Sequence, residues 1–256
     1  MTNHARLAEA HAIINDILSR CQQILLAFSG GKESVVLAHM LQPWRDRVTL
    51  VWVNTGDGPI GMADYVRGYR AKFNFVELSS DPRSTWARFG PPADVVPTEA
   101  ARPCTPGPKL QPWSTCCWRN RNEPLLLYVR DAGALLRDRG LRSAHLCGQR
   151  RDDYAYSREE ARDQLPYPEP AWPLWDWIEA DVMSYVDANG LRLPPHYAEV
   201  IDSMDCMSCP ADLTADRLRY LDRHFPDLAA EVRRTSAAAR EIGRAALDAV
   251  ESALTV

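Results

Sequence analysis

Residues 23–41 read QILLAFSGGKESVVLAHML, and no other stretch says as much about the fold. Its first part, Gln23–Ser29, is a short apolar run typical of a buried parallel strand. Its last part, Ser34–Leu41, has the composition of a helix, and the glycine-rich segment SGGKES joins the two. A strand that turns through glycines into a helix predicts the first βα unit of an α/β domain.

Strand-like and helix-like segments continue to alternate on both sides of this stretch. The alternation predicts a parallel sheet with right-handed crossovers and helices on both faces, which is a three-layer α/β fold. The expected helices and strands are an amphipathic helix over 4–20, strands over 48–54, 73–78 and 142–147, and a helix over 62–72.

Proline dominates one long segment of the chain. Residues 81–122 contain eight prolines, which exclude a long helix or a central strand there. A loop of this length inside a compact domain is usually functional or disordered. Helices are expected in three further places. One has Pro124 near its start, a second ends at Gly190, and the third region runs from Cys209 to the end of the chain. We therefore expect one domain over residues 1–212 and a helical extension over 213–256.

Composition narrows the class of protein. The 256 residues are 46% hydrophobic and 25% charged, with a formal net charge of −4. No apolar run approaches the ~18 residues of a membrane helix, and the acidic balance argues against a free-standing nucleic-acid binder. The N-terminus lacks the pattern of a secretory signal, so the expected location is the cytoplasm.

The segment SGGKES has the chemistry of a phosphate-binding loop. Gly30 and Gly31 allow positive φ angles and a close approach to a ligand. Main-chain N–H groups at the start of the helix, the Lys32 ammonium and the hydroxyls of Ser29 and Ser34 all suit phosphate oxygens. The alternative is an ordinary strand–turn–helix connection. The position of SGGKES at the carboxyl edge of the predicted sheet favours phosphate binding over this alternative.

Seven cysteines, in a compartment expected to be reducing, indicate a metal or catalysis rather than disulfides. Cys206 and Cys209 form a CxxC pair, while Cys116 and Cys117 are adjacent and need a helical or turn backbone to face one ligand. Four thiolates can hold a 4Fe–4S cluster or a zinc ion, and their number does not separate the two. The alternative is a surface CxxC with two buried cysteines.

These motifs together resemble a known family. SGGK followed by an acidic residue and serine resembles the pyrophosphate loop of the N-type ATP pyrophosphatases. Over roughly residues 20–212 the chain resembles the phosphoadenosine-phosphosulfate (PAPS) reductase family, which has an adenine nucleotide α-hydrolase-like fold. The resemblance rests on SGGKES, Asn54-Thr55-Gly56, Cys116-Cys117 with Pro124-Leu125, Gly148-Gln149-Arg150, Trp177 with Asp181-Val182, and Cys206-Met207-Ser208-Cys209.

The resemblance implies a site for an adenine nucleotide, either ATP or an adenylylsulfate. The residues that would bind it are Ser29, Gly30, Gly31, Lys32, Glu33, Ser34, Asn54, Gly56 and Gly148. A Cys-Cys pair followed by a distant CxxC also looks like the 4Fe–4S pattern of assimilatory adenylylsulfate reductases, in which a basic residue stands where Arg121 stands here. This implies a 4Fe–4S cluster on Cys116, Cys117, Cys206 and Cys209, with zinc as the alternative.

Two departures from the family bear on the reaction. Reductases of this family end in a Glu-Cys-Gly-(Ile/Leu)-His tail, whereas here the 47 residues after Cys209 contain no thiol. The loop also keeps Lys32, as in members that bind ATP. The resemblance therefore implies an ATP pyrophosphatase-type enzyme of sulfur metabolism that forms an AMP-acceptor and pyrophosphate with Mg²⁺. Lys32 and Arg150 would be catalytic, with Arg151 and Arg119 as weaker candidates.

Other functions stay open at this point. One is adenylylsulfate or phosphoadenylylsulfate reduction that uses Cys104 or the thiol of a partner protein. Another is a non-catalytic nucleotide-sensing subunit of a sulfur-modification complex. Sulfate, tRNA, DNA and a small molecule all remain open as the acceptor, a thiol reductant or a sulfur-donor protein as a partner, and the C-terminal helices as a homo-oligomer contact.

Several single residues have two interpretations. Asp57 is a metal or ribose contact or a turn residue, and Cys147 belongs to the nucleotide pocket or to the core. Cys21, His145 and His196 are expected to be structural.

Overall fold

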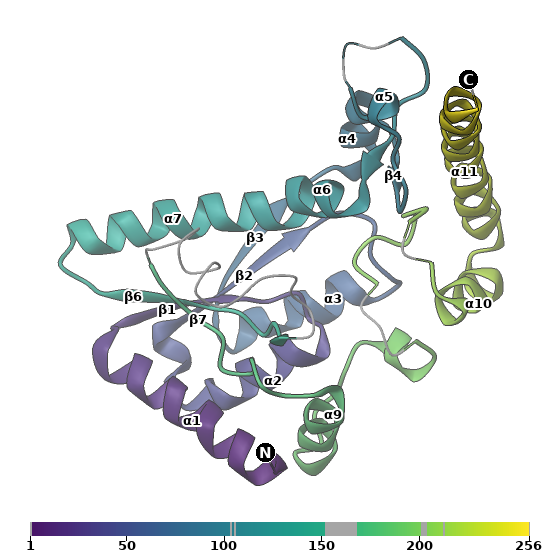
Figure 1. Cartoon of the computed structure of the whole chain (residues 1–256). Coiled ribbons are helices and arrows are strands. Elements are labelled where there is room, and N and C mark those ends of the chain that lie inside the picture. The colour runs from purple at the N-terminus through teal and green to yellow at the C-terminus, as the bar shows by residue number, and fades with distance from the viewer. Residues whose placement is uncertain are drawn as a thin grey trace. The chain divides into compact units, whose positions relative to one another are not determined.

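The computed structural model describes residues 2–102, 104, 106–151, 168–200, 204–211 and 213–255 (Figure 1). The chain forms two compact units, each built from three segments. The first, which we call the sheet unit, comprises Met1–Val53, Ile60–Leu78 and Pro124–Pro195. The second, the cysteine unit, comprises Asn54–Pro59, Ser79–Glu123 and His196–Val256. The predicted division at residue 212 falls on a residue outside the described ranges and stays a prediction.

A five-stranded sheet forms the centre of the sheet unit. Its order is β3-β2-β1-β6-β7, and β1 pairs in parallel with both β2 and β6. The apolar run of β1 is buried because the strand lies in the middle of the sheet, and Ile24 and Leu26 have no exposed surface. The strands are β1 (Gln23–Ala27), β2 (Val48–Asn54), β3 (Asn74–Ser79), β6 (Ser143–Leu146) and β7 (Glu169–Ala171).

Helices cover both faces of this sheet, which confirms the predicted three-layer α/β class. In Figure 1, α7 lies over one face, and α1 and α2 lie over the other. The core joins α1, β1, α2 and β2, with Val36, Leu37 and Leu50 fully buried. The helices are α1 (Asn3–Arg20), α2 (Lys32–Met40), α3 (Met62–Arg67), α7 (Glu123–Asp138) and α9 (Glu179–Ala188), with 3₁₀ turns at Gln42–Arg47 and Gly68–Ala71; a further 3₁₀ turn, Pro195–Ala198, starts in this unit and ends in the cysteine unit.

Strand β7 was not expected from the sequence. It contains Pro170 and pairs in parallel with β6, with Pro170 opposite His145. Proline lacks the N–H that a central strand needs, but β7 is the last strand of the sheet order, where one side needs no partner. The proline-rich composition therefore hid an edge strand. Pro166, which belongs to the same proline-rich stretch, lies outside the described residues.

The cysteine unit consists of short elements and two long helices. The absence of a long helix or central strand over 81–122 is confirmed for the described part of that segment, where the longest element has eight residues. The elements are α4 (Pro82–Phe89), β4 (Pro92–Ala93), α5 (Thr98–Ala101), β5 (Gln111–Pro112), α6 (Trp113–Cys117), a π-helical turn (Trp118–Asn122), α10 (Ala215–His224) and α11 (Pro226–Leu254).

Two apolar clusters hold these elements together. The larger cluster places Met204 and Met207 against Leu221 of α10 and Val232 of α11. The smaller cluster packs Ala239 of α11 against Ala93, Ala100 and Leu110 near the β4–β5 pair. The predicted C-terminal helical region is thus confirmed, and Pro226 divides it into α10 and α11.

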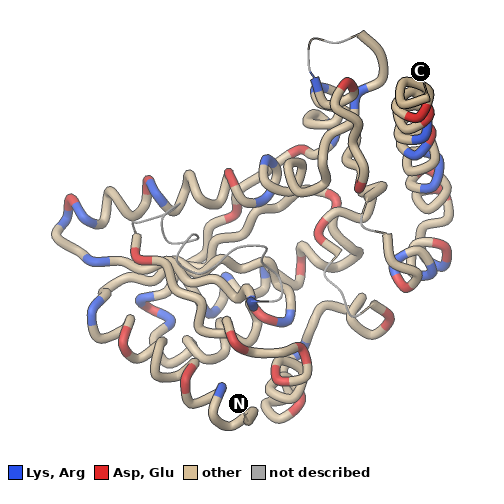
Figure 2. Tube along the Cα trace, viewed as in Figure 1, with Lys and Arg blue, Asp and Glu red and all other residues tan. Residues whose placement is uncertain are grey.

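The end of α11 exposes apolar side chains. Leu247, Val250 and Leu254 are 60%, 56% and 81% exposed, and residues of both charge signs occur along the helix (Figure 2). Self-association through these helices stays a prediction. Among the described residues, no helix combines the length and the apolar character that crossing a membrane requires.

Candidate nucleotide and cysteine sites

The order of the sheet explains where the phosphate loop lies. Strand β1 connects to β2 on one side and has β6 on its other side, so the strand order reverses between β1 and β6. In open parallel sheets, ligands bind at the carboxyl edge next to such a reversal. Ser29–Ser34 span the loop after β1 and the first turn of α2, and the segment after β6 contains Gly148 and Arg150. The fold therefore brings these two predicted motifs together.

Hydrogen bonds within the loop shape it. The Gly30 N–H donates to Ser34 Oγ at 3.1 Å, and Ser34 Oγ donates to the Gly31 carbonyl at 2.9 Å. The Gly31 N–H donates to Ser29 Oγ at 3.2 Å. Gly30 has a φ of 80°, and a Cβ there would lie 2.6 Å from Val66 Cγ2. Glycine is therefore required at position 30, and the two serines stabilise the turn.

A second close approach involves Gly148. A Cβ at this position would lie 2.9 Å from Glu33 Cβ and 3.2 Å from the Ser34 main-chain nitrogen. The segment after β6 therefore packs directly on the first turn of α2. Only glycine permits this approach without displacing the phosphate loop.

Two buried cations lie beside the loop. Lys32 and Arg150 are only 4% and 9% exposed. Both are close to Glu33, with Lys32 Nζ 3.6 Å and Arg150 Nε 3.3 Å from Glu33 Oε1. Lys32 Nζ and Arg150 Nη2 are each also 4.0 Å from Glu179 Oε2. Two cations and two carboxylates thus meet at the N-terminus of α2, where main-chain N–H groups favour an anion.

Cys147 and His145 lie in the core next to this edge of the sheet. Cys147 Sγ is 3.4 Å from His145 Nε2, and Cys147 packs with Trp172 and Trp175. Burial raises the pKa of the Cys147 thiol to about 12 and lowers the pKa of His145 to about 4. Both groups are therefore neutral near pH 7, which suits a role in packing.

The cysteine unit presents its first cysteine pair on a helix. Cys116 and Cys117 end α6, and the helical backbone continues as a π-helical turn. A helical backbone is one of the two conformations that both thiols would need to face one ligand. Cys116 is buried, and its sulfur lies 3.3 Å from Trp86 Nε1 and 3.6 Å from Asn120 Nδ2. Two N–H donors therefore point at this sulfur.

The second pair lies in a loop that polar contacts hold. The main-chain N–H of Ser208, between the two cysteines, donates to Asp57 Oδ2 at 3.2 Å, and its hydroxyl donates to the same oxygen. Met207 N–H donates to the Asp57 carbonyl at 2.7 Å. Asp205, the residue before the loop, accepts a hydrogen bond from Thr55 at its carbonyl and pairs with Arg121 at 2.7 Å.

Electrostatic effects link Cys209 of the second pair to Cys116 and Cys117 of the first. Burial raises the pKa of Cys209 to about 11, with Cys117 and Cys116 adding to the shift. Asp205, Cys117 and Cys206 raise the pKa of Arg121, the basic residue expected beside them. Cysteines of the two pairs are thus linked electrostatically at Cys209, and Arg121 is linked to one thiol of each pair. Soft thiolate ligands suit zinc or an iron–sulfur cluster.

The geometry of a single metal ion is not formed. Among the described residues, no group of three or more His, Cys, Asp or Glu side chains has an arrangement that could hold one ion. The predicted 4Fe–4S cluster and its zinc alternative therefore stay proposals.

The remaining candidates are placed as follows. Cys104 is exposed in the proline-rich loop, and Cys21 is buried. Arg119 donates to Gln111 Oε1 at 2.8 Å and lies over the Phe89 ring. Arg151 is exposed and pairs with Asp176 at 3.4 Å.

Asn54 and Gly56 form a turn of the cysteine unit. The Gly56 N–H donates to Asn54 Oδ1 at 2.9 Å, and the φ of Gly56 is 71°.

Sequence reasoning missed two residues. Glu179, the first residue of α9, lies beside both cations of the phosphate loop. Arg217 of α10 donates to main-chain carbonyls of the CxxC loop. No motif distinguishes either residue in a chain of 30 basic and 34 acidic residues.

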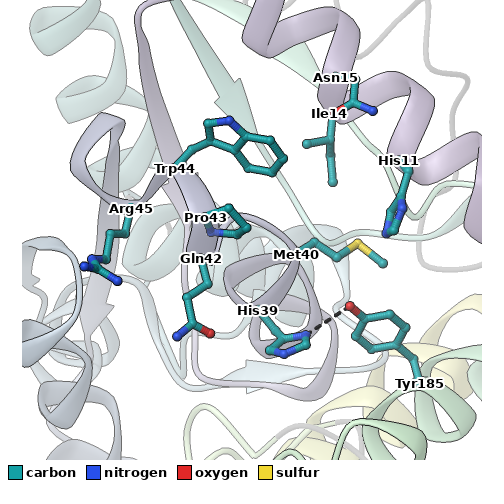
Figure 3. Close-up of a pocket in the computed structure, with 10 residues that line it drawn as sticks. All are labelled: His11, Ile14, Asn15, His39, Met40, Gln42, Pro43, Trp44, Arg45 and Tyr185. Carbon is teal, nitrogen blue, oxygen red and sulfur yellow. Dashed lines mark hydrogen bonds between the residues drawn. The ribbon is translucent and has the colours of Figure 1, made fainter.

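A hollow of about 520 Å³ lies at the other end of α2 (Figure 3). His11, Met40, Trp44 and Tyr185 line it, and His39 Nδ1 is 3.0 Å from the Tyr185 hydroxyl. Its lining includes none of the described residues Ser29–Ser34, so it is separate from the candidate nucleotide site.

Comparison with known proteins identifies the family. Residues 23–212 match the model of the phosphoadenosine phosphosulfate reductase domain. The chain belongs to this family, as its motifs suggested.

Among curated proteins, the chain is 26% identical over 216 residues to adenosine 5'-phosphosulfate reductase of Burkholderia cepacia, covering 80% of this chain and 76% of that protein. It is 23% identical over 202 residues to an uncharacterized protein of Methanocaldococcus jannaschii, covering 79% of this chain but only 44% of that protein. A solved phosphoadenylyl-sulfate reductase from Candida auris matches with a TM-score of 0.44 and 15% identity, over 72% of this chain and 81% of that one.

Proposed function

We propose that this protein binds ATP at the Ser29–Ser34 loop and cleaves it between the α- and β-phosphates to adenylate an acceptor oxyanion. The supporting observation is the pair of buried cations, Lys32 and Arg150, beside a glycine loop at the N-terminus of α2. Glu33 and Glu179 hold these two cations in place, and the cations and the main-chain N–H groups at the N-terminus of α2 together offer several donors to phosphate oxygens. Mg²⁺ would offset the charge of the pyrophosphate.

The proposed step follows from this charge distribution. The acceptor oxygen attacks the α-phosphorus, and the bond from that phosphorus to the bridging oxygen breaks. Pyrophosphate leaves with the electron pair, so negative charge grows beside Lys32. Arg150 neutralises charge on the α-phosphate or the acceptor. Groups that stabilise developing charge in a water-poor site contribute most to such reactions.

We further propose that Cys116, Cys117, Cys206 and Cys209 hold a 4Fe–4S cluster. The N–H donors of Trp86 and Asn120 at Cys116 and the Arg121 guanidinium support this proposal, because such groups stabilise anionic sulfur. With four thiolates no iron site would be open, so the cluster would shape the electrostatic field rather than carry an extra sulfide.

Pyrophosphate release tests the first proposal. Lys32→Ala should lower ATP-dependent pyrophosphate release by about 100-fold or more. Lys72→Ala is the matched control, because Lys72 is a lysine outside the Ser29–Ser34 loop. It follows the turn Gly68–Ala71, and its ammonium lies over the Tyr69 ring. Equal release by wild type and Lys32→Ala would contradict the proposal.

Metal analysis of anaerobically purified protein tests the second. We expect iron and acid-labile sulfide with absorption near 400 nm, lost in Cys206→Ser and retained in Cys104→Ser, whose cysteine is exposed. Zinc without iron would contradict the cluster.

A second candidate function is adenylylsulfate reduction, which the named activity of the Burkholderia cepacia relative favours. A thiolate would attack the sulfur, release AMP and form a thiosulfonate, and a second thiol would then release sulfite and leave a disulfide. Sulfite formation from adenylylsulfate and a thiol reductant, without any need for ATP, would support this function over the first. Loss of sulfite in Cys104→Ser would identify the attacking thiol.

A further inference from the structure

Arg217 lies under the loop that carries the CxxC pair. Its Nη2 atom donates to the carbonyls of Cys206 at 2.8 Å, Cys209 at 2.9 Å and Met207 at 3.3 Å. Its Nη1 atom donates to the Ala211 carbonyl at 3.3 Å. The residue is 9% exposed and belongs to α10, beyond the residues 23–212 that match the family.

This arrangement orients the loop. A guanidinium is a planar fork of donors, so several carbonyls can converge on it at once. When the carbonyls of Cys206, Met207 and Cys209 all turn toward Arg217, the loop closes into a tight turn, in which Cys209 N–H donates to the Cys206 carbonyl at 3.3 Å. Arg217 thereby constrains the main chain at both cysteines.

Asp57 holds the same loop by accepting hydrogen bonds from the loop's N–H groups. Its carboxylate accepts hydrogen bonds from the Ser208 N–H and hydroxyl, and its carbonyl accepts the Met207 N–H. Arg217 therefore takes the carbonyls of the loop, while Asp57 takes the N–H groups between the two cysteines. A loop held through both kinds of group has little freedom to rearrange.

We propose that Arg217 is a positioning residue that holds the Cys206–Cys209 loop in the conformation in which both thiolates bind the metal group. The inference rests on the proposed four-cysteine site. A residue outside the matched family region would then complete a site inside it.

The test compares Arg217→Met and Arg217→Lys with two controls in the full chain. Arg219→Met removes an exposed arginine of the same helix, and Leu221→Ala removes a fully buried side chain that packs in the core of the unit. For each protein we would measure iron, zinc and sulfide content, the rate of metal release to a chelator, and the unfolding midpoint.

We expect Arg217→Met to release metal about 10- to 100-fold faster than wild type, the usual range for residues that support metal ligands. Arg217→Lys keeps the positive charge but loses the planar fork of donors, so its rate of metal release should lie between those of wild type and Arg217→Met. Leu221→Ala should lower the unfolding midpoint without a matching increase in metal release. Metal retention by Arg217→Met equal to wild type would overturn the proposal, as would equal metal loss in Leu221→Ala at the same midpoint.

A second readout works without metal. Mass spectrometry of alkylated, metal-free protein reports how accessible Cys206 and Cys209 are. Arg217→Met should raise their alkylation rates several-fold relative to Arg219→Met, and unchanged rates would overturn the ordering role. Wild-type protein that binds neither iron nor zinc would refute the four-cysteine proposal, whereas the alkylation rates would still decide whether Arg217 orders the loop.

Discussion

The phosphate loop and the CxxC loop are built in opposite ways. In the phosphate loop, the hydrogen bonds that shape the turn join residues two to four positions apart, as between Gly30 and Ser34. In the CxxC loop, Ser208 is bonded to Asp57, 151 positions earlier, and Cys209 to Arg217, eight positions later. The first loop is a local structure that a sheet edge presents, while the second depends on segments that only folding brings together.

This difference has a practical consequence. A local loop is stable in shape as long as the strand and helix beside it are intact, so its variants should mainly change ligand binding. A loop held by distant residues changes shape when any one of those residues is lost. Three predictions test this contrast, and they are given in decreasing order of the effect on stability.

The first prediction concerns the buried core beneath the phosphate loop. The pKa of His145 is about 4 because burial disfavours its charged form, compared with 6.5 in an unfolded chain. Between these pH values the unfolded state binds a proton that the folded state does not. Stability should therefore fall as pH drops from 6.5 to 4, by up to about 3 kcal/mol.

Denaturant unfolding at a series of pH values checks this. His145→Gln should lose most of that pH dependence, whereas the exposed His11 can be replaced by glutamine as a control that keeps it. An identical pH profile in His145→Gln and wild type would show that another group is responsible.

The second prediction concerns the close approach of Gly148 to α2. Gly148→Ala places a Cβ 2.9 Å from Glu33 Cβ, and such overpacking typically costs about 1–3 kcal/mol. We expect ATP affinity to fall about tenfold, measured by calorimetry, because the phosphate loop must shift to make room. Metal content should remain unchanged.

Gly68→Ala is the control, since a Cβ there meets nothing within 4 Å. Wild-type ATP affinity in Gly148→Ala would mean that the phosphate loop tolerates displacement, and the local description of this loop would be wrong.

The third prediction concerns Asp57, for which the sequence left a ligand contact or a turn role open. Asp57→Asn removes the charge that Ser208 bonds to, at a cost of about 1–2 kcal/mol. Alkylation of Cys206 and Cys209 in metal-free protein should become faster, while ATP affinity should stay within about twofold of wild type. Asp248→Asn, at an exposed position of α11, provides the control.

A large loss of ATP affinity in Asp57→Asn, with unchanged alkylation, would instead make Asp57 a nucleotide contact. That result would also weaken the contrast between the two loops, because one residue would then serve the phosphate site rather than the cysteine loop.

Most of the sheet unit followed from the sequence because each element has its own local signal. The apolar run at Ile24–Leu26 and the helical pattern after Lys32 both appear in the structure within a residue or two of the expected bounds. Strand β7 is the exception. Pro170 is acceptable only on an edge strand, and the order of strands in the sheet is not written in any one segment.

Local motifs alone were enough to predict the α/β class and to identify the glycine loop and the four candidate thiols. Each of these motifs is defined by residue types at a fixed spacing within a short segment, so it can be recognised without the fold. The folded chain was needed to show that Glu179 joins Lys32 and Arg150, and that Arg217 and Asp57 hold the CxxC loop. The reason is physical: the residues next to a single charged residue in the sequence do not indicate its role. Its role is set by the side chains and carbonyls that folding places within hydrogen-bonding distance.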